Sequence, residues 1–209
     1  MDGILISSID SVERSWTRWA LMRGVDPVWA CQVAHGRRGV DSMAILRPDL
    51  DPDAETRIVE GFEIEDTAGV AGLPGVLALL AALPAGRWTV VTSATETLAR
   101  VRLAAGGVPA PERMVTAESV SEGKPNPAPY LAGAALLGLR PEECVVFEDA
   151  AAGANAGRAA GCTVVATIFS HSIESLAAAH YLIEDLTAVE VTTHSGEEEF
   201  DLTFTPLPA

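Results

Sequence analysis

Basic side chains are scarce in this sequence. The 209 residues contain 14 lysines and arginines against 29 aspartates and glutamates, which gives a formal net charge of −15 at pH 7. A surface this acidic repels nucleic acid backbones and anionic lipid, so neither is expected as a partner. A small anionic substrate stays compatible with the sequence only where a metal ion or a local cluster of basic groups reverses the field.

Cysteines and long apolar runs are also few. The three cysteines, Cys31, Cys144 and Cys162, are odd in number and widely spaced, which predicts buried free thiols in a reducing compartment rather than disulfides or a zinc site. No basic segment precedes a long apolar region, as in a signal peptide, and no run reaches the ~18 apolar residues that span a bilayer. We therefore predict a cytoplasmic protein without membrane contact.

The first third of the chain carries a helical pattern. Apolar residues recur at helical spacing from Ile9 until Gly24 ends the run, and Asp26 followed by Pro27 combines a helix cap with a first-turn proline. The pattern predicts helices over 9–23, 27–34, 41–46 and 53–65, with the tryptophans as core anchors.

From about residue 72, short apolar runs alternate with helical stretches. Such runs are typical of a parallel sheet that helices cover on both faces. The predicted strands are 88–92, 113–117, 144–149, 162–169 and 181–185. In these sheets the carboxyl ends of the strands carry the ligand site. Residues 188–209 alternate apolar and polar on both sides of Ser195-Gly196, which predicts a β-hairpin with the acidic run 197–199 at its exposed tip.

Polar residues follow two of these strands and one loop. Thr92 and Ser93 end a strand, where hydroxyls and free helix N–H groups could seat a phosphate, unless Ser93 is a plain helix cap paired with Glu96. Lys124 lies in a loop and either neutralises a phosphate, pairs with a carboxylate or is simply exposed.

Two acids, Glu148 and Asp149, end another strand. Buried carboxylates need a cation or hydrogen-bond donors, and oxygen ligands suit Mg²⁺. The alternative for Asp149 is that its side chain caps the helix that follows.

The order of these motifs resembles that of the haloacid dehalogenase-like hydrolase superfamily, in the subgroup with a helical cap. "GKPNPAPYL", "VVFEDAAAGANAGRAAG" and "AHYLIEDLTAV" are close to that subgroup's wording, and the resemblance covers Met1 to about Leu186. It implies an α/β fold, a Rossmann-like parallel-sheet core with an inserted α-helical cap. The implied domains are a core over 1–8 and 72–187, a cap over 9–71 and a C-terminal hairpin tail over 188–209.

The opening "MDGILISS" matches the family's Asp-x-Asp-Gly motif from its middle residue onward. The resemblance implies that Asp2 is the general acid and base, and that the nucleophilic first aspartate would stand immediately before Met1. We therefore expect the 209 residues alone to lack activity. An upstream segment left out by the choice of an internal start is the favoured explanation, and a catalytically dead relative is the alternative.

The resemblance also implies a function and its residues. The expected activity is hydrolysis of small sugar or polyol phosphates with Mg²⁺, through an aspartyl-phosphate. The implied metal residues are Asp2, Glu148 and Asp149, and those for the phosphoryl group are Thr92, Ser93 and Lys124. A phosphomutase would share these residues, and a non-catalytic protein that binds a phosphorylated ligand is a third possibility. A dehalogenase is disfavoured because it needs no metal.

Substrate selection is expected to lie in the cap. The loop "HGRRG" places His35, Arg37 and Arg38 together and resembles the cap loop of glycerol-phosphate and deoxysugar-phosphate phosphatases, although a solvated loop is the alternative. Ser7 and Ser8 stand where the family often has an aspartate, a position expected to affect substrate rather than phosphoryl chemistry. We expect a monomer whose partner is a small phosphorylated metabolite.

Overall fold

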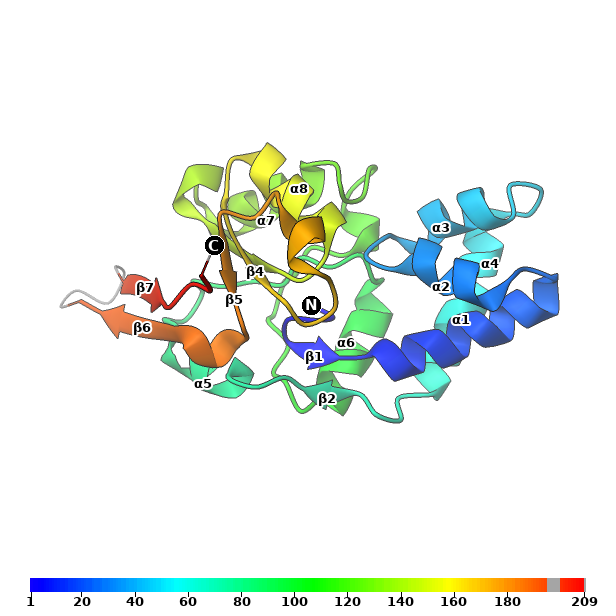
Figure 1. Cartoon of the computed structure of the whole chain (residues 1–209), viewed down its shortest axis with the longest axis horizontal. Helices are drawn as coiled ribbons and strands as arrows, with labels where there is room; N and C mark the ends of the chain where they lie inside the picture. Colours follow the sequence, from blue (N-terminus) through cyan, green and yellow to red (C-terminus); the bar gives the residue numbers. More distant parts are fainter. Residues whose placement is uncertain (195–199, 209) are drawn as a thin grey trace.

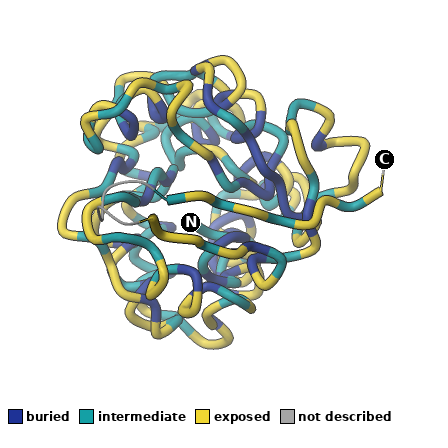
Figure 2. The backbone as a smooth tube through the Cα atoms, turned by 90° about the vertical axis from the view of Figure 1, so that its left-hand side faces the viewer, coloured by how far each residue is buried: buried dark blue, intermediate teal, exposed yellow. Residues whose placement is uncertain are grey.

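A computed structural model of the chain describes residues 1–194 and 200–208. Four helices form one end of the molecule, an α/β core forms the other, and the N-terminus lies between the two (Figure 1). The predicted acidic tip at 197–199 and the predicted turn at Ser195-Gly196 lie outside the described residues. Figure 2 shows the buried stretches running through the interior, with exposed backbone in the surface loops.

The four-helix part, hereafter the helical unit, has a hydrophobic core of its own. Its helices are α1 (Ile9–Arg23), α2 (Pro27–Ala34), α3 (Gly39–Leu46) and α4 (Pro52–Glu65). Trp16, Trp19 and Met43 are buried at its centre, so Trp16 and Trp19 are core anchors as predicted. Trp29 is 45% exposed, so the prediction is wrong for this third tryptophan of the unit. The side chain of Asp26 accepts a hydrogen bond from the backbone of Trp29 and caps α2, where the sequence placed the cap. The predicted helices are confirmed within two residues.

The core contains the predicted parallel sheet, in the order β3-β4-β5. Its strands are β3 (Val145–Glu148), β4 (Thr163–Thr167) and β5 (Tyr181–Ile183). Successive residues of β4 face opposite layers: Val164 packs with α7 (Ala128–Leu137) and α8 (Ala151–Ala160), whereas Val165 belongs to the hydrophobic cluster on the other face. Helix α8 approaches the sheet closely because Gly157 has no side chain; a Cβ there would lie 2.9 Å from Val164. The sheet is thus covered on both faces.

Two predicted strands do not form regular strands. Segments 88–92 and 113–117 run side by side, but only one isolated parallel bridge joins them, between Val91 and Val115. The N-terminal segment likewise forms only the short β1 (Ile6–Ser7), which pairs antiparallel with β2 (Ala71–Gly72). An apolar run predicts burial, but whether a ladder extends depends on the neighbours that the fold supplies.

The remaining elements complete the core. They are the helices α5 (Val76–Ala82) and α6 (Glu96–Ala105), the antiparallel strands β6 (Val189–Thr193) and β7 (Phe200–Phe204), and short 3-10 helices at Ala117–Ser119, Pro141–Glu143, Ile173–Leu176 and Leu186–Ala188. The β6–β7 pair confirms the predicted hairpin strands. All three cysteines are free, but only Cys162 is buried; Cys31 and Cys144 are partly exposed, so the prediction of full burial is wrong for these two. None of the described helices is long and apolar enough to cross a bilayer.

Candidate active site

A cavity of about 810 Å³ lies between the helical unit and the carboxyl ends of the core strands. All nine residues that the sequence analysis selected line it: Asp2, His35, Arg37, Arg38, Thr92, Ser93, Lys124, Glu148 and Asp149. Segments almost 150 residues apart in the sequence therefore meet at one place. This convergence makes the cavity the candidate active site.

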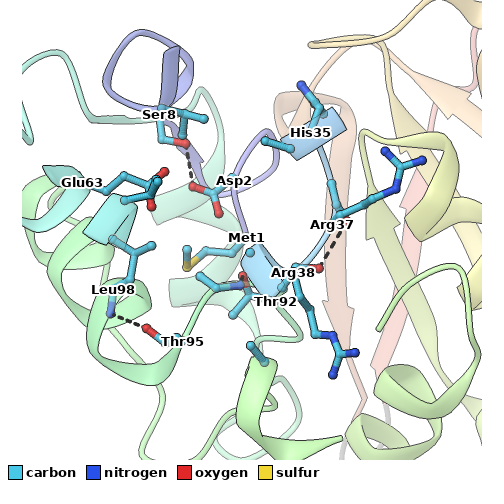
Figure 3. A pocket seen from close by; sticks show the side chains of 18 of the residues that line it. Met1, Asp2, Ser8, His35, Arg37, Arg38, Glu63, Thr92, Thr95 and Leu98 are labelled. Atoms are coloured by element: carbon cyan, nitrogen blue, oxygen red, sulfur yellow. Dashed lines mark hydrogen bonds between the residues drawn. The ribbon is translucent and has the colours of Figure 1, made fainter. Parts of the chain in front are cut away.

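Asp2 is held by two donors. Ser8 Oγ donates a hydrogen bond to Asp2 Oδ1 over 2.6 Å, and Arg102 Nη1 lies 3.1 Å from the same oxygen. Burial opposes the ionisation of Asp2, but Arg102, the Met1 amino group and Ser8 outweigh it, so the pKa of Asp2 is lowered. Figure 3 shows Asp2 below Ser8, with Glu63 beside it. Ser8, which the sequence analysis expected to affect the substrate, here hydrogen-bonds the carboxylate that the family resemblance assigns to proton transfer.

Arg102 joins Asp2 to the helical unit. Its Nη2 lies 3.0 Å from Glu63 Oε1, and both side chains are more than 90% buried. Burial raises the pKa of Glu63 despite this cation, because Asp2 adds a second negative charge nearby. Neither residue is predicted from the sequence as part of the site. The available signal was the position of Arg102 on the apolar face of α6, next to Leu98 and Leu103, since an arginine there needs buried anionic partners.

Lys124 and Glu148 form a second buried ion pair. Lys124 Nζ lies 2.5 Å from Glu148 Oε1, and the Tyr130 hydroxyl donates to the same oxygen. Glu148 Oε2 accepts hydrogen bonds from the backbone N–H groups of Asp149 and Ala150. Burial opposes ionisation, but Lys124, the N-terminal amino group and Tyr130 hold the pKa of Glu148 at about 2. Lys124 is thus not an exposed lysine, and Tyr130 is a partner that sequence reasoning did not find.

Of the three carboxylates Asp2, Glu148 and Asp149, Asp149 has the negative charge that its neighbours balance least. It is 6% exposed, and the Ser170 hydroxyl donates to its Oδ2. Burial and the charge of Glu148 raise its pKa. Its side chain does not cap α8, whose N-cap is Ala150, so that alternative is wrong.

Both oxygens of Glu148 are already engaged by Lys124, Tyr130 and two backbone N–H groups, so Asp2 and Asp149 are the carboxylates of this set that could ligate a hard divalent cation. The raised pKa of Asp149 is a sign of uncompensated negative charge, which a bound cation would relieve. These two carboxylates therefore offer the type of ligand that such a cation prefers.

Thr92 and Ser93 lie at the start of the connection to α6. Thr92 is buried and its Oγ1 accepts from Ala94 N, whereas Ser93 Oγ donates to the Gly36 carbonyl of the helical unit over 3.3 Å. The predicted capping role of Ser93 is wrong, because α6 begins later and Thr95 caps it by accepting from the Leu98 N–H. Ser93 is therefore free of the helix and lies on the cavity wall.

The arginines of the "HGRRG" loop are engaged within the protein. Arg37 Nη1 donates to the Val33 carbonyl, and Arg38 binds both oxygens of Asp41 and the Val120 carbonyl of the core. In Figure 3 both guanidinium groups extend away from Asp2. Although both residues border the cavity, Arg38 serves here to attach the helical unit to the core, a contact that no local pattern foretells.

Comparisons with known proteins agree with this arrangement. Residues 1–161 match the family described as haloacid dehalogenase-like hydrolase. The chain is 41% identical to hexitol phosphatase A of Escherichia coli over 92% of its length and 91% of that protein's. It is 32% identical to glycerol-1-phosphate phosphohydrolase 1 of Saccharomyces cerevisiae, over 98% and 88% of the two chains. A crystal structure of a hydrolase from Pseudomonas syringae superposes with a TM-score of 0.77 at 25% identity, over 88% of this chain and 91% of the other.

Proposed function

Because this chain belongs to the haloacid dehalogenase-like hydrolase family, we propose that it hydrolyses small sugar or polyol phosphates in a Mg²⁺-dependent reaction. One observation carries the proposal: a single cavity is lined by Asp2, the carboxylate assigned to proton transfer, by the buried Lys124, by the hydroxyls of Thr92 and Ser93, and by Asp149, whose charge a cation would balance. The similarity to a hexitol phosphatase and a glycerol-1-phosphate phosphohydrolase supports the choice of substrate class.

In the proposed site Asp149 and Asp2 would hold Mg²⁺, which neutralises the charge of the phosphoryl oxygens when bound, while Glu148 holds Lys124 in place. Lys124 adds a fixed positive charge beside Glu148, and Thr92 with the Ser93 N–H binds the transferred group. Positioning and charge neutralisation supply most of phosphoryl-transfer catalysis, and this set of groups provides both.

Asp2 would exchange the protons. Its lowered pKa keeps it ionised in the free protein, which suits the step in which it activates water. To act first as an acid it must gain a proton, and a phosphate dianion nearby favours this because a like charge raises a carboxyl pKa. The phosphoryl acceptor is the family's first motif aspartate, which corresponds to the position before Met1, and it would form an aspartyl-phosphate.

The helical unit would act as the cap that contacts the part of the substrate distal to the phosphoryl group and so selects the substrate. Its contribution to the cavity wall includes four acids, Glu13, Asp53, Glu60 and Glu63, and three arginines, Arg37, Arg38 and Arg57. Carboxylates accept hydrogen bonds from hydroxyl groups, and guanidinium groups donate to them. This polar wall therefore suits a hydroxyl-rich distal part, as in a polyol or sugar phosphate.

The test compares two chains extended by the family's first strand, one ending in Phe-Asp before Met1 and a matched control ending in Phe-Asn. Each is incubated with hexitol, hexose and glycerol phosphates, with and without Mg²⁺, and released phosphate is measured. We expect Mg²⁺-dependent release from the Phe-Asp chain alone. Isomerised sugar phosphate without free phosphate would indicate a mutase instead, and no reaction with any ester would refute the proposal.

A further inference from the structure

Two imidazoles and a carboxylate converge at the edge of the cavity, and the proposed reaction uses only one of the three groups. Each of His35, Asp149 and His171 offers a ligand atom, and these atoms all lie within 4.8 Å of one another. Among the described residues this is the one trio of histidine, cysteine, aspartate or glutamate side chains that comes this close. We propose that His35, His171 and Asp149 form a binding site for a transition-metal ion such as Zn²⁺.

The trio comes from three separate parts of the fold. His35 ends α2 of the helical unit, Asp149 follows β3, and His171 lies in the segment after β4. The rings of His35 and His171 meet edge to face, with centroids 4.6 Å apart. An ion bound here would therefore link the helical unit directly to the core.

Neighbouring contacts already place the ligands. Ser170 Oγ lies 2.8 Å from His171 Nδ1 and also donates to Asp149 Oδ2, so one hydroxyl orients both core ligands and leaves His171 Nε2 available. On the other side Ser93 Oγ donates to the Gly36 carbonyl, beside His35. Gly36 is also close to the core, since a Cβ there would lie 3.3 Å from Ala150 Cβ. The loop that carries His35 is thus held against the core before any ion binds.

The chemistry of the trio favours zinc over magnesium. Imidazole nitrogen suits Zn²⁺, Co²⁺ and Ni²⁺, whereas Mg²⁺ prefers oxygen alone. Around a tetrahedral zinc with bonds of about 2.0–2.1 Å, ligand atoms are roughly 3.4 Å apart, so rotations that close the 4.8 Å spacing by up to about 1.4 Å complete the site. Three protein ligands leave a fourth position for water or a phosphate oxygen.

Asp149 belongs to both this site and the proposed Mg²⁺ site, so the two ions would compete for it. A transition metal would hold the helical unit to the core while removing a ligand from Mg²⁺. We therefore expect a bound transition metal to stabilise the folded chain and to inhibit its proposed Mg²⁺-dependent reaction.

The test measures binding directly and does not depend on turnover, so its outcome is separate from that of the proposed function. Zn²⁺ is titrated into the full chain by calorimetry in a buffer containing millimolar Mg²⁺. The variants are His35→Ala and His171→Ala, with His194→Ala as the matched control. His194 pairs with Asp201 next to the hairpin, so its loss removes one imidazole without touching the trio. Cys31→Ser is a second control, because that thiol also borders the cavity.

We expect one Zn²⁺ per wild-type chain, at least tenfold weaker binding in each of the two histidine variants, and unchanged binding in both controls. Thermal unfolding of the same proteins without metal establishes that each variant folds. Added Zn²⁺ should then raise the melting temperature of the wild type and controls but not of His35→Ala or His171→Ala. Wild-type affinity in both histidine variants, no binding to the wild type, or loss of binding in Cys31→Ser would each overturn the proposal.

Discussion

The cluster of Asp2, Arg102 and Glu63 contains one cation and two anions, and this imbalance leads to an asymmetric prediction. Replacing Arg102 with methionine keeps a similar apolar volume but leaves the buried Glu63 and the partly exposed Asp2 without their counter-charge. Breaking a buried pair from one side costs about 3–5 kcal/mol of unfolding free energy. For a protein of this size that corresponds to a fall in melting temperature of about 6–20 °C.

Replacing Glu63 with glutamine should have a much smaller effect. It removes the excess negative charge and leaves Arg102 paired with Asp2, so we expect the unfolding free energy at pH 7 to stay within about 1 kcal/mol of the wild type. The raised pKa of Glu63 sets the pH dependence. The stability linked to a raised carboxyl pKa is complete below the unfolded pKa and is lost as pH rises through the folded value. The glutamine variant has no such loss, so its unfolding free energy should increase relative to that of the wild type between pH 5 and pH 8.

The assay is urea denaturation of the wild type, Arg102→Met and Glu63→Gln at pH 5 and pH 8, with Arg102→Lys as an intermediate that keeps the charge. Equal losses in the methionine and glutamine variants would show that the contact, and not the charge balance, stabilises the cluster. A methionine variant as stable as the wild type would refute the reasoning altogether.

Two further predictions concern the other acids. Gly3 has φ +73°, and a Cβ there would lie 1.8 Å from Asp149 Oδ2, so Gly3→Ala should displace that carboxylate and weaken Mg²⁺ binding at least tenfold by calorimetry. Gly107→Ala, with φ +68° but open space around its Cβ position, is the control for backbone strain alone, and equal Mg²⁺ affinities in the two variants would contradict the argument. Lys124→Met should cost about 3–5 kcal/mol at neutral pH because Glu148 stays buried without its cation. Lys124 helps to hold the pKa of Glu148 at about 2, so in the variant this pKa should rise and Glu148 should take up a proton on acidification. The loss of unfolding free energy should therefore shrink at low pH, and a loss that urea denaturation shows to be independent of pH would contradict this prediction.

Local signals in the sequence determined much of the architecture. Capping by Asp26 and the glycine stop at Gly24 act through contacts within one turn of helix, so the bounds of the first helices followed from the residues themselves. The continuous apolar runs predicted buried parallel strands, and three of them form the sheet. The rule that ligands bind at carboxyl ends of strands was enough to select Thr92 and Asp149, and both line the cavity.

The tertiary structure alone decided which charges meet. Arg102 and Glu63 are 39 positions apart and carry no motif, yet they join the helical unit to Asp2. Arg38 borders the cavity, but its guanidinium also binds Asp41 and the Val120 carbonyl, and the pattern of the loop does not indicate the second of these partners. A sequence pattern reports the spacing of residues along one helix or strand. The position of a buried charge depends instead on the cost of its desolvation and on partners that come from distant segments. Those partners exist only once the chain has folded.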